Sequence, residues 1–531
     1  MEIAQNSVLL RQGGQFVDRY LALYAESGSR RFFAAAGRGF REDISRSRVC
    51  EAARREGTFS RSWEKSGFFR FLEVVLNLPP LVLQWIYAKT GGALEGSTVF
   101  RGLNFLGDRL DLLMGLFFFA MLVAPHAVWN NLYGLIGILA LICLFLIWLM
   151  RRPKARVHVK YFTVYLALYG IWIIYGFASS LSRSLSLRFF LFHITCFLIV
   201  FLVVSRIGSY RQLKRLIGFA LAGLTLSGLY GCYQGVVGVA VVASQADLAL
   251  NAGMPGRIYS FFDNPNNFAE ILVMLIPFYL AFILNAKSFR ARALIIAAGL
   301  PPLASIALTY SRSGWIGLAL AVLIFLAFQN WRFVPLFVLL GLASLPFLPK
   351  TIINRILTIG NTEDTSTMYR FAIYKAVFRL LRDFWATGVG LGSDIMKRIF
   401  QNYPPMFDGN YPIHSHDNYL QIWGETGILG IVAYIAVLLA QLKAGILRIS
   451  RRTCPREVRN VTLAAVSGLC GILVVGIAEY TWFYPRNMFL FWFLFAVIGA
   501  GVKLADKSAR EGAAEAVGEN PAGKPSDAQA R

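Results

Sequence analysis

Apolar and polar residues are distributed along this chain in long blocks rather than singly. Between Leu112 and Lys503, apolar stretches follow one another, each bounded by charged or turn-forming residues. A stretch of about 17 to 25 apolar residues is long enough to cross a hydrocarbon core of about 30 Å as a helix. The pattern predicts an all-α, polytopic membrane protein with about 12 transmembrane helices.

The twelve predicted spans fall into two groups, separated by one long connector at residues 349–417. Nine spans precede the connector and lie within residues 112–348, and three follow it within residues 418–503. In order, they are 112–125, 131–150, 161–180, 187–205, 215–241, 266–286, 291–309, 313–328, 332–348, 418–442, 459–479 and 486–503.

The number of lysine and arginine residues alternates between high and low from one connector to the next, and this alternation predicts the topology. The five connectors expected on the inside carry 19 basic residues, whereas the five short outside connectors carry five. Basic residues concentrate in short cytosolic loops, while long loops are translocated largely regardless of charge. We therefore expect both termini in the cytosol and the 349–417 loop on the extracytoplasmic side of the membrane.

Composition supports a membrane protein and changes the meaning of the net charge. Of the 531 residues, 56% are apolar and 15% charged, and the formal net charge is +24. A soluble chain would carry about a quarter charged residues, and in one this charge would suggest a nucleic-acid partner. Here most basic residues lie between apolar blocks, so we expect membrane lipids as partners and no nucleic acid.

The segments outside the spans differ from them in composition and in predicted structure. Residues 1–67 hold twelve basic residues and no apolar block, which is typical of a weakly ordered cytosolic arm, either solvated or lying on anionic lipid. Residues 68–111 begin with an apolar run broken by Glu73 and Pro79, and we expect an interfacial segment there rather than a thirteenth span. Residues 504–531 are predicted to be a disordered cytosolic tail.

Two arginines stand at predicted outer turns. Arg257 precedes the run Asn264, Pro265 and Asn266, which suits a turn leading into a helix N-terminus. Arg312, between two apolar runs, lies close to the hydrocarbon boundary, where an anionic partner is expected. An arginine fork pairs with phosphate through two hydrogen bonds. A lipid headgroup is the alternative partner for either side chain.

Histidines mark a third outer cluster, at the end of the long loop. His414 and His416 stand two residues apart, followed by Asp417. A metal site would need a further ligand that the sequence does not supply, and we expect no metal and no cofactor. Histidine is the side chain whose usual pKa suits general base work near neutral pH, and helix capping is the alternative role.

The long loop contains a helical pattern over 367–384 with a basic face that includes Arg370, followed by Gly388 to Gly392. No βαβ unit surrounds this glycine run, so we interpret it as a flexible turn rather than a nucleotide loop. The basic helix either guides an anionic polymer or is simply solvated.

Together these motifs resemble the O-antigen ligase superfamily, whose members include O-antigen ligases and polymerases. The resemblance covers residues 112–503 in architecture. It is sharpest in four motifs: Arg257 with Asn264-Pro265-Asn266, Ser311-Arg312-Ser313, Arg370 followed by the GVGLG run, and His416 with Gly427 and Gly430. Asp417 departs from the pattern, which usually has Asn, Ser or Gln after the histidine; His414 is the fallback base.

The resemblance implies a GT-C-like fold and a metal-independent, inverting glycosyltransferase. The implied donor is a glycan on undecaprenyl pyrophosphate, and the acceptor a lipid-linked or other glycan, in surface polysaccharide biosynthesis. The implied catalytic residues are His416, Arg312 and Arg257. The substrate-binding residues would be Arg370, Asn264, Asn266, Asp417 and His414.

Two alternatives remain at this level. A polymerase of O-antigen or exopolysaccharide would use the same donor site as a ligase, because the matched motifs are shared. A polysaccharide or lipid transporter would need a polar path through the spans, where His193 is almost the only ionisable residue.

Overall fold

The computed structural model describes residues 58–518, apart from positions 154, 158, 243–252, 360, 362–364 and 406–410, together with five single residues before position 27. Within this part of the chain every regular element is a helix. Among the described residues, ten helices are long and apolar enough to cross a membrane. The chain is therefore an all-α, polytopic membrane protein, as the apolar blocks predicted.

Each of the twelve predicted spans coincides with a helix. Those before the long loop are α8 (Leu110–Val123), α9 (Leu132–Met150), α10 (Val164–Ala178), α11 (Arg183–Arg206), α12 (Tyr210–Val237), α13 (Pro265–Asn285), α14 (Phe289–Leu308), α15 (Arg312–Asn330) and α16 (Phe333–Ser344). Those after it are α20 (Asn418–Ile449), α21 (Arg456–Val475) and α22 (Pro485–Gly518). Helices α8, α10 and α16 are shorter than the other nine.

The centre of the bundle is built from α13, α21 and α22, whose apolar stretches are 83%, 78% and 94% buried. Helix α22 packs against α11, α20 and α21, and α21 also packs against α13 and α15. Small residues allow these close approaches: a Cβ atom on Gly468 of α21 would lie 2.4 Å from the Met274 carbonyl oxygen of α13. Close packing through glycine is typical of helices in membranes.

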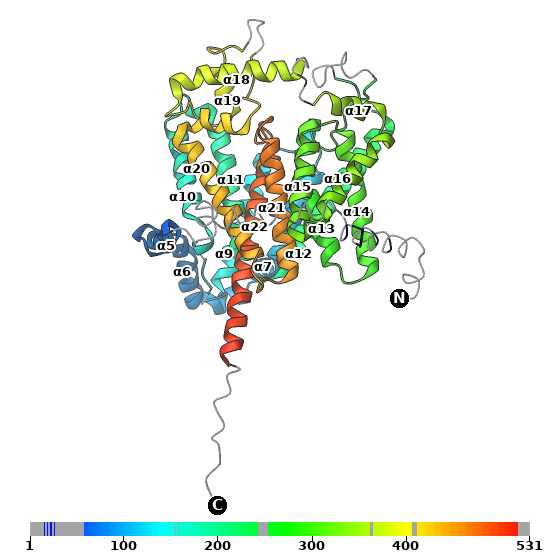
Figure 1. The fold of residues 1–531 in the computed structure, drawn as a ribbon. Coiled ribbons are helices and arrows are strands. Elements are labelled where there is room, and N and C mark those ends of the chain that lie inside the picture. Colours follow the sequence, from blue (N-terminus) through cyan, green and yellow to red (C-terminus); the bar gives the residue numbers. More distant parts are fainter. Residues whose placement is uncertain are drawn as a thin grey trace, which may run out of the picture.

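One end of the bundle is covered by the long loop (Figure 1). The loop folds into α17 (Lys350–Leu357), α18 (Thr365–Phe384) and α19 (Ser393–Ile399). Helix α18 lies across the top of the bundle and packs on α20, with Ile373, Val377 and Leu380 of α18 in a small separate core. Two 3-10 turns, His126–Val128 and Val159–Tyr161, join neighbouring spans, and a third, Leu345–Phe347, follows α16.

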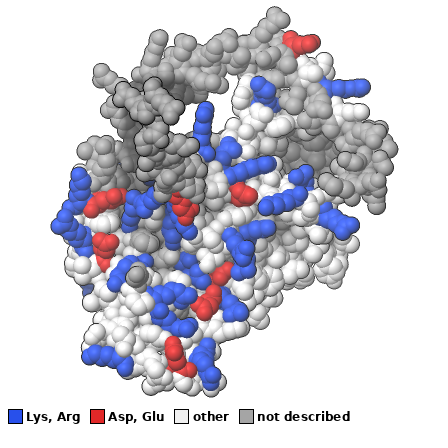
Figure 2. Space-filling view, turned by 90° about the horizontal axis from the view of Figure 1, so that it is seen from below, with Lys and Arg blue, Asp and Glu red and all other residues white. Residues whose placement is uncertain are grey.

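The opposite end carries the basic connectors. Figure 2 views the molecule from that side and shows lysine and arginine side chains gathered over it. We call this surface, formed by the connectors 151–160, 205–215 and 443–459, the basic face. Its position opposite α18 supports the proposed orientation, with the loop outside and the basic face inside.

The segment before the first span forms α5 (Thr58–Lys65), α6 (Gly67–Gly96) and α7 (Thr98–Asp108). By length and composition α6 is also a candidate span. Its middle, however, is tied to the basic face: Asn77 exchanges two hydrogen bonds with the backbone of Val157, and Gln84 donates to the Leu149, Arg152 and Ala155 carbonyls. These contacts support the proposed interfacial placement of this segment.

The two ends of the chain are only partly described. Residues 1–57 of the predicted arm lie outside the described residues, apart from five single positions, while its last residues form α5. At the other end, α22 continues to Gly518, so the tail predicted to be disordered from residue 504 is helical over its first half. The sequence there, rich in alanine and charged helix formers, explains the extension. Residues 519–531 lie outside the described residues.

Candidate functional site

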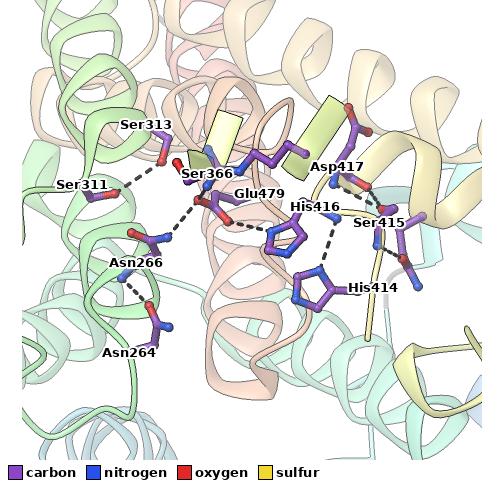
Figure 3. Close-up of polar contacts among 12 residues, drawn as sticks. Asn264, Asn266, Ser311, Ser313, Ser366, His414, Ser415, His416, Asp417 and Glu479 are labelled. Atoms are coloured by element: carbon purple, nitrogen blue, oxygen red, sulfur yellow. Dashed lines mark hydrogen bonds and ion pairs between the residues drawn. The ribbon is translucent and has the colours of Figure 1, made fainter. Parts of the chain in front are cut away.

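The outer clusters identified in the sequence meet between the bundle and α18 (Figure 3). Asn264 and Asn266 come from the start of α13, Ser311 and Ser313 from the start of α15, and the histidines from the segment before α20. A carboxylate that the sequence did not single out, Glu479 in the connector between α21 and α22, lies among them.

Arg257 is held by the start of α13 and the end of α14. The side chain is buried, its Nε donates to the Thr309 carbonyl oxygen at 2.7 Å, and an Nη atom donates to Asn266 Oδ1 at 2.5 Å. Asn264 caps α13 by accepting from the Asn266 N–H at 2.8 Å, with Pro265 in the first turn. The turn predicted from the sequence therefore exists, and it orients Arg257.

Arg312 begins α15 and reaches the loop above it. Its two Nη atoms donate to the Thr358 carbonyl oxygen and to Ser366 Oγ, each at 2.9 Å. The two residues before Arg312 have special roles. Tyr310 has a φ of 50°, which is strained for a residue other than glycine. Ser311 caps α15, because its Oγ accepts from the Gly314 N–H at 3.4 Å. Non-glycine residues at positive φ store strain and occur often at functional sites. Arg312 thus links α15 to α17 and α18.

A fourth arginine, Arg355 of α17, was missed in the sequence. It is 4% exposed, and its Nε donates to the Tyr310 carbonyl oxygen at 3.3 Å. Burial, together with the positive charges of Arg355, Arg370 and Arg312, lowers the pKa of Arg257 to about 9, while Glu479 opposes this shift. The other three guanidinium groups are therefore close enough to Arg257 to repel its positive charge. We call Arg257, Arg312, Arg355 and Arg370 the arginine cluster.

Glu479 is the counter-charge at which the two sides of the site meet. It forms an ion pair with Arg370 of α18 and accepts from Asn266 Nδ2 at 2.9 Å, and His416 Nδ1 lies 3.6 Å from its other oxygen. Burial raises the pKa of this carboxyl, but Arg370 and His416 outweigh burial and hold the pKa at about 2. Glu479 is therefore ionised at any physiological pH.

His416 adopts an uncommon backbone conformation with a φ of 53°. Its ring is 29% exposed although Nδ1 is buried, so the exposed part is the edge that faces away from Glu479. An Nδ1–H directed at the carboxylate leaves Nε2 able to accept a proton. Tyr374 of α18 donates to the His416 carbonyl oxygen at 3.2 Å and further fixes this residue.

His414 supports His416 rather than replacing it. Its Nδ1 accepts from the His416 backbone N–H at 3.2 Å, and its ring lies 4.7 Å from that of Phe483. Burial, with a further contribution from His416, lowers the pKa of His414 to about 3. A histidine that stays neutral and is already used as an acceptor is a poor general base, which disfavours the fallback assignment.

Asp417 is used by the helix that it begins. Its buried carboxylate accepts from the backbone N–H groups of Tyr419 and Leu420 at 2.8 and 2.7 Å, which is the N-cap arrangement. Burial raises the pKa of Asp417, and these two hydrogen bonds partly offset the shift. Its contacts favour a capping role over the substrate contact that the resemblance implied.

The run Gly388 to Gly392 is not the flexible turn expected from the sequence. Gly388, Gly390 and Gly392 all have positive φ, and the N–H groups of Val389 and Gly390 donate to carbonyls of α20 at 2.8 and 3.1 Å. A Cβ atom on Gly390 would lie 2.1 Å from Ser180 Oγ. The glycines are needed because the backbone passes through a narrow space.

This run docks where α20 itself is kinked. Gly427 interrupts α20 with φ 74° and ψ −178°, and the Ile428 N–H donates to the Trp385 carbonyl oxygen at 2.8 Å. A Cβ atom on Gly427 would lie 2.0 Å from the Ala386 carbonyl oxygen. The first of the two motif glycines after His416 thus permits contact between α20 and the loop.

The assembled site is rich in positively charged side chains and contains one candidate side chain for acid–base chemistry, His416. The arginine cluster and Glu479 leave a formal charge of +3 in a space that also contains His416. No group of three histidine, cysteine, aspartate or glutamate side chains suited to a metal ion occurs among the described residues. Guanidinium groups at fixed positions bind phosphate oxygens, so the arrangement suits a phosphorylated ligand beside a hydroxyl that can be deprotonated.

Comparison with known proteins agrees with this geometry. Residues 297–435 match the family model described as O-antigen ligase, and they include Arg312, Arg355, Arg370 and His416. No curated protein matches the chain. The match supports a glycosyltransferase-like enzyme with a ligase- or polymerase-like role in surface polysaccharide synthesis, acting on lipid-linked glycans. Residues 297–435 are therefore similar to the O-antigen ligase family, which supports the resemblance seen in the sequence motifs.

Proposed function

We propose that this protein transfers a glycan from undecaprenyl pyrophosphate to an acceptor hydroxyl at the outer face of the bacterial cytoplasmic membrane. The observation that carries the proposal is the arginine cluster around one carboxylate that also faces His416. A pyrophosphate leaving group gains negative charge as its bond to the sugar breaks. Fixed cations in a partly buried site stabilise that charge without reorganising.

The proposed reaction is one displacement at the anomeric carbon. His416 Nε2 takes the proton of the acceptor hydroxyl as its oxygen forms the new glycosidic bond. The bond between the anomeric carbon and the pyrophosphate oxygen breaks, and the electron pair stays on the pyrophosphate. Attack opposite to the leaving group inverts the anomeric configuration. Arg257 and Arg312 are assigned to the pyrophosphate, and Arg355 and Arg370 complete its surroundings.

Glu479 has a positioning role in this scheme. Its carboxylate faces His416 Nδ1 at 3.6 Å and pairs with Arg370, so it stabilises the protonated histidine that the reaction creates. A carboxylate beside the non-reacting nitrogen of a histidine also selects the tautomer that leaves the other nitrogen as base. The same group holds Asn266, which in turn contacts Arg257.

The test is an assay with purified protein in lipid. The donor is an undecaprenyl-pyrophosphate oligosaccharide, offered separately with a lipid A core acceptor and with a second lipid-linked oligosaccharide. Transfer to the first acceptor would identify a ligase, and elongation of the second a polymerase. A chelator arm tests metal independence, and NMR of the new anomeric proton tests inversion.

Arg312→Ala is the variant that tests the site, with Arg382→Ala as its matched control. Arg382 is an exposed arginine on α18, outside the cluster. We expect Arg312→Ala to lower transfer by about 100-fold or more, the usual cost of losing one charge-stabilising donor, and Arg382→Ala to retain it. Full activity in Arg312→Ala, or equal losses in both, would contradict the assignment.

A further inference from the structure

A cavity opens at the basic face, far from the site beneath α18. Its volume is about 500 Å³. The walls come from the start of α10, from the second half of α20 and from α22 between Gly499 and Asp506, with Glu64 of α5 at its edge. Neither the arginine cluster nor His416 lines it, so the cavity is a separate feature.

Small residues make room for the cavity. Ala436, Ala440 and Ala444 of α20 line it at intervals of four residues, which places them on one side of that helix, and Gly499 of α22 also lines it. Larger side chains at these positions would fill the space. The cavity is therefore built into the packing of α20 with its neighbours.

The charged residues of the cavity lie toward the basic face and are mainly positive. Lys160, Lys443 and Arg448 line it together with Glu64 and Asp506. Asp506 pairs with Arg448 at 3.4 Å and also with Arg451 at 3.2 Å. The lining therefore has three basic residues against two acidic ones, and Arg451 beside Asp506 adds a further positive charge next to the cavity, which favours an anionic occupant.

The other end of the cavity continues into an exposed apolar track on α20. Leu439, which lines the cavity, is 62% exposed, and Ile435, Val432 and Leu429 are exposed on the same side of the helix at intervals of three or four residues. This track begins near the middle of α20, where Leu439 borders the cavity, and runs away from the basic face to Leu429, just after the kink at Gly427. A ligand with a charged head and an apolar tail would match both ends.

We propose that this cavity binds one anionic phospholipid of the inner leaflet. The phosphate lies between Lys160 and Lys443, and an acyl chain follows Leu439 and Ile435 along α20. Basic pockets between transmembrane helices on the cytoplasmic side are a recurrent way to hold anionic headgroups. The apolar track distinguishes a lipid from a soluble phosphate compound. The proposal is independent of the function proposed above.

Native mass spectrometry of the full chain in detergent tests the proposal. The probes are phosphatidylglycerol and phosphatidylcholine with identical acyl chains, and inorganic phosphate. We expect one phosphatidylglycerol to bind about 30-fold more tightly than phosphatidylcholine, a difference of about 2 kcal/mol, because Lys160 and Lys443 both attract the anionic headgroup. Equal affinity for the two lipids would overturn the proposal, as would displacement of the lipid by millimolar phosphate.

Two kinds of variant locate the binding. Lys160→Gln with Lys443→Gln should abolish the preference for phosphatidylglycerol, whereas Lys375→Gln with Lys397→Gln, which removes two exposed charges from the α18 side, should preserve it. Ala440→Trp keeps every charge but fills the cavity, and it should also abolish tight binding. If the double glutamine variant and Ala440→Trp both kept the preference for phosphatidylglycerol, the proposal would be overturned. Lys160→Arg with Lys443→Arg should bind as wild type and controls for folding.

Discussion

The two sides of the site differ in how firmly their groups are held. On the side of α13, α15 and α17, Arg257 and Arg355 are about 95% buried and donate to backbone carbonyls of Thr309 and Tyr310. On the side of α18 and α20, His416 keeps 29% of its ring exposed. Groups that stabilise charge work best when fixed, whereas a base has to meet an incoming hydroxyl.

Removing His416 should give the largest effect and tests the accessible side. We expect His416→Ala to lower the transfer rate by about 1,000-fold, within the range for a general base, while donor binding persists because the arginine cluster is intact. Rate and donor affinity are measured separately, by product formation and by binding of labelled donor. A variant that keeps the wild-type rate would remove His416 from the mechanism.

Arg355 tests the buried side of the site, formed by α13, α15 and α17. Only the structure identifies this residue. Arg355→Ala should lower transfer by about 100-fold and weaken donor binding. Arg355→Lys should recover little, because an ammonium does not reproduce the guanidinium fork. The contrast with His416→Ala lies in the binding measurement: if both variants bound donor equally well, the division of roles between the two sides would be wrong.

Glu479→Gln tests the group that joins the two sides. We expect transfer to fall by about 10- to 100-fold, the range seen when a carboxylate that orients a functional histidine is lost. Glu425→Gln, in a buried carboxylate of α20 that hydrogen-bonds Gln421, is the control for a buried charge elsewhere. A Glu479→Gln variant that transfers glycan at the wild-type rate would contradict the positioning role.

The smallest expected effect concerns stability and His414. Its pKa of about 3 in the folded protein lies below the usual 6.5, so the unfolded chain binds more protons between these values. Stability should therefore fall as pH drops from about 6.5 toward 3. His414→Asn removes this titration and should show a smaller loss of Tm between pH 7 and pH 4. If the variant and the wild type lost the same Tm between pH 7 and pH 4, the titration of His414 would not contribute to stability.

The sequence predicted the spans and several candidate residues of the site, for reasons that can be identified. Apolar blocks specify helices locally, and Arg257, Arg312 and His416 stand in short motifs at outer turns. Glu479 lies in a short connector without a motif, and Arg355 lies in an ordinary amphipathic helix. Glu479 becomes important only when segments more than 100 residues apart meet, as it does with Arg370, and Arg355 only when α17 meets the turn before α15. Single-sequence patterns do not encode such contacts.

The same limit explains the roles that were misjudged. Gly388 to Gly392 looked flexible because glycine permits many conformations, but here it fits one narrow path beside α20. For Asp417 the resemblance implied a substrate contact, whereas its carboxylate caps α20, which is a common use of aspartate at that position. In both cases local chemistry allowed two outcomes, and packing selected one.

The kink at Gly427 divides α20 into two pieces of different character. Residues 428–449 would form a rod roughly 33 Å long, close to the thickness of a hydrocarbon core. The ten residues from Asn418 to Gly427 are then left above the bilayer, attached to the loop rather than to lipid. The kink at Gly427 therefore lets contacts with the loop, rather than the spanning part of α20, set the position of the segment that carries His416.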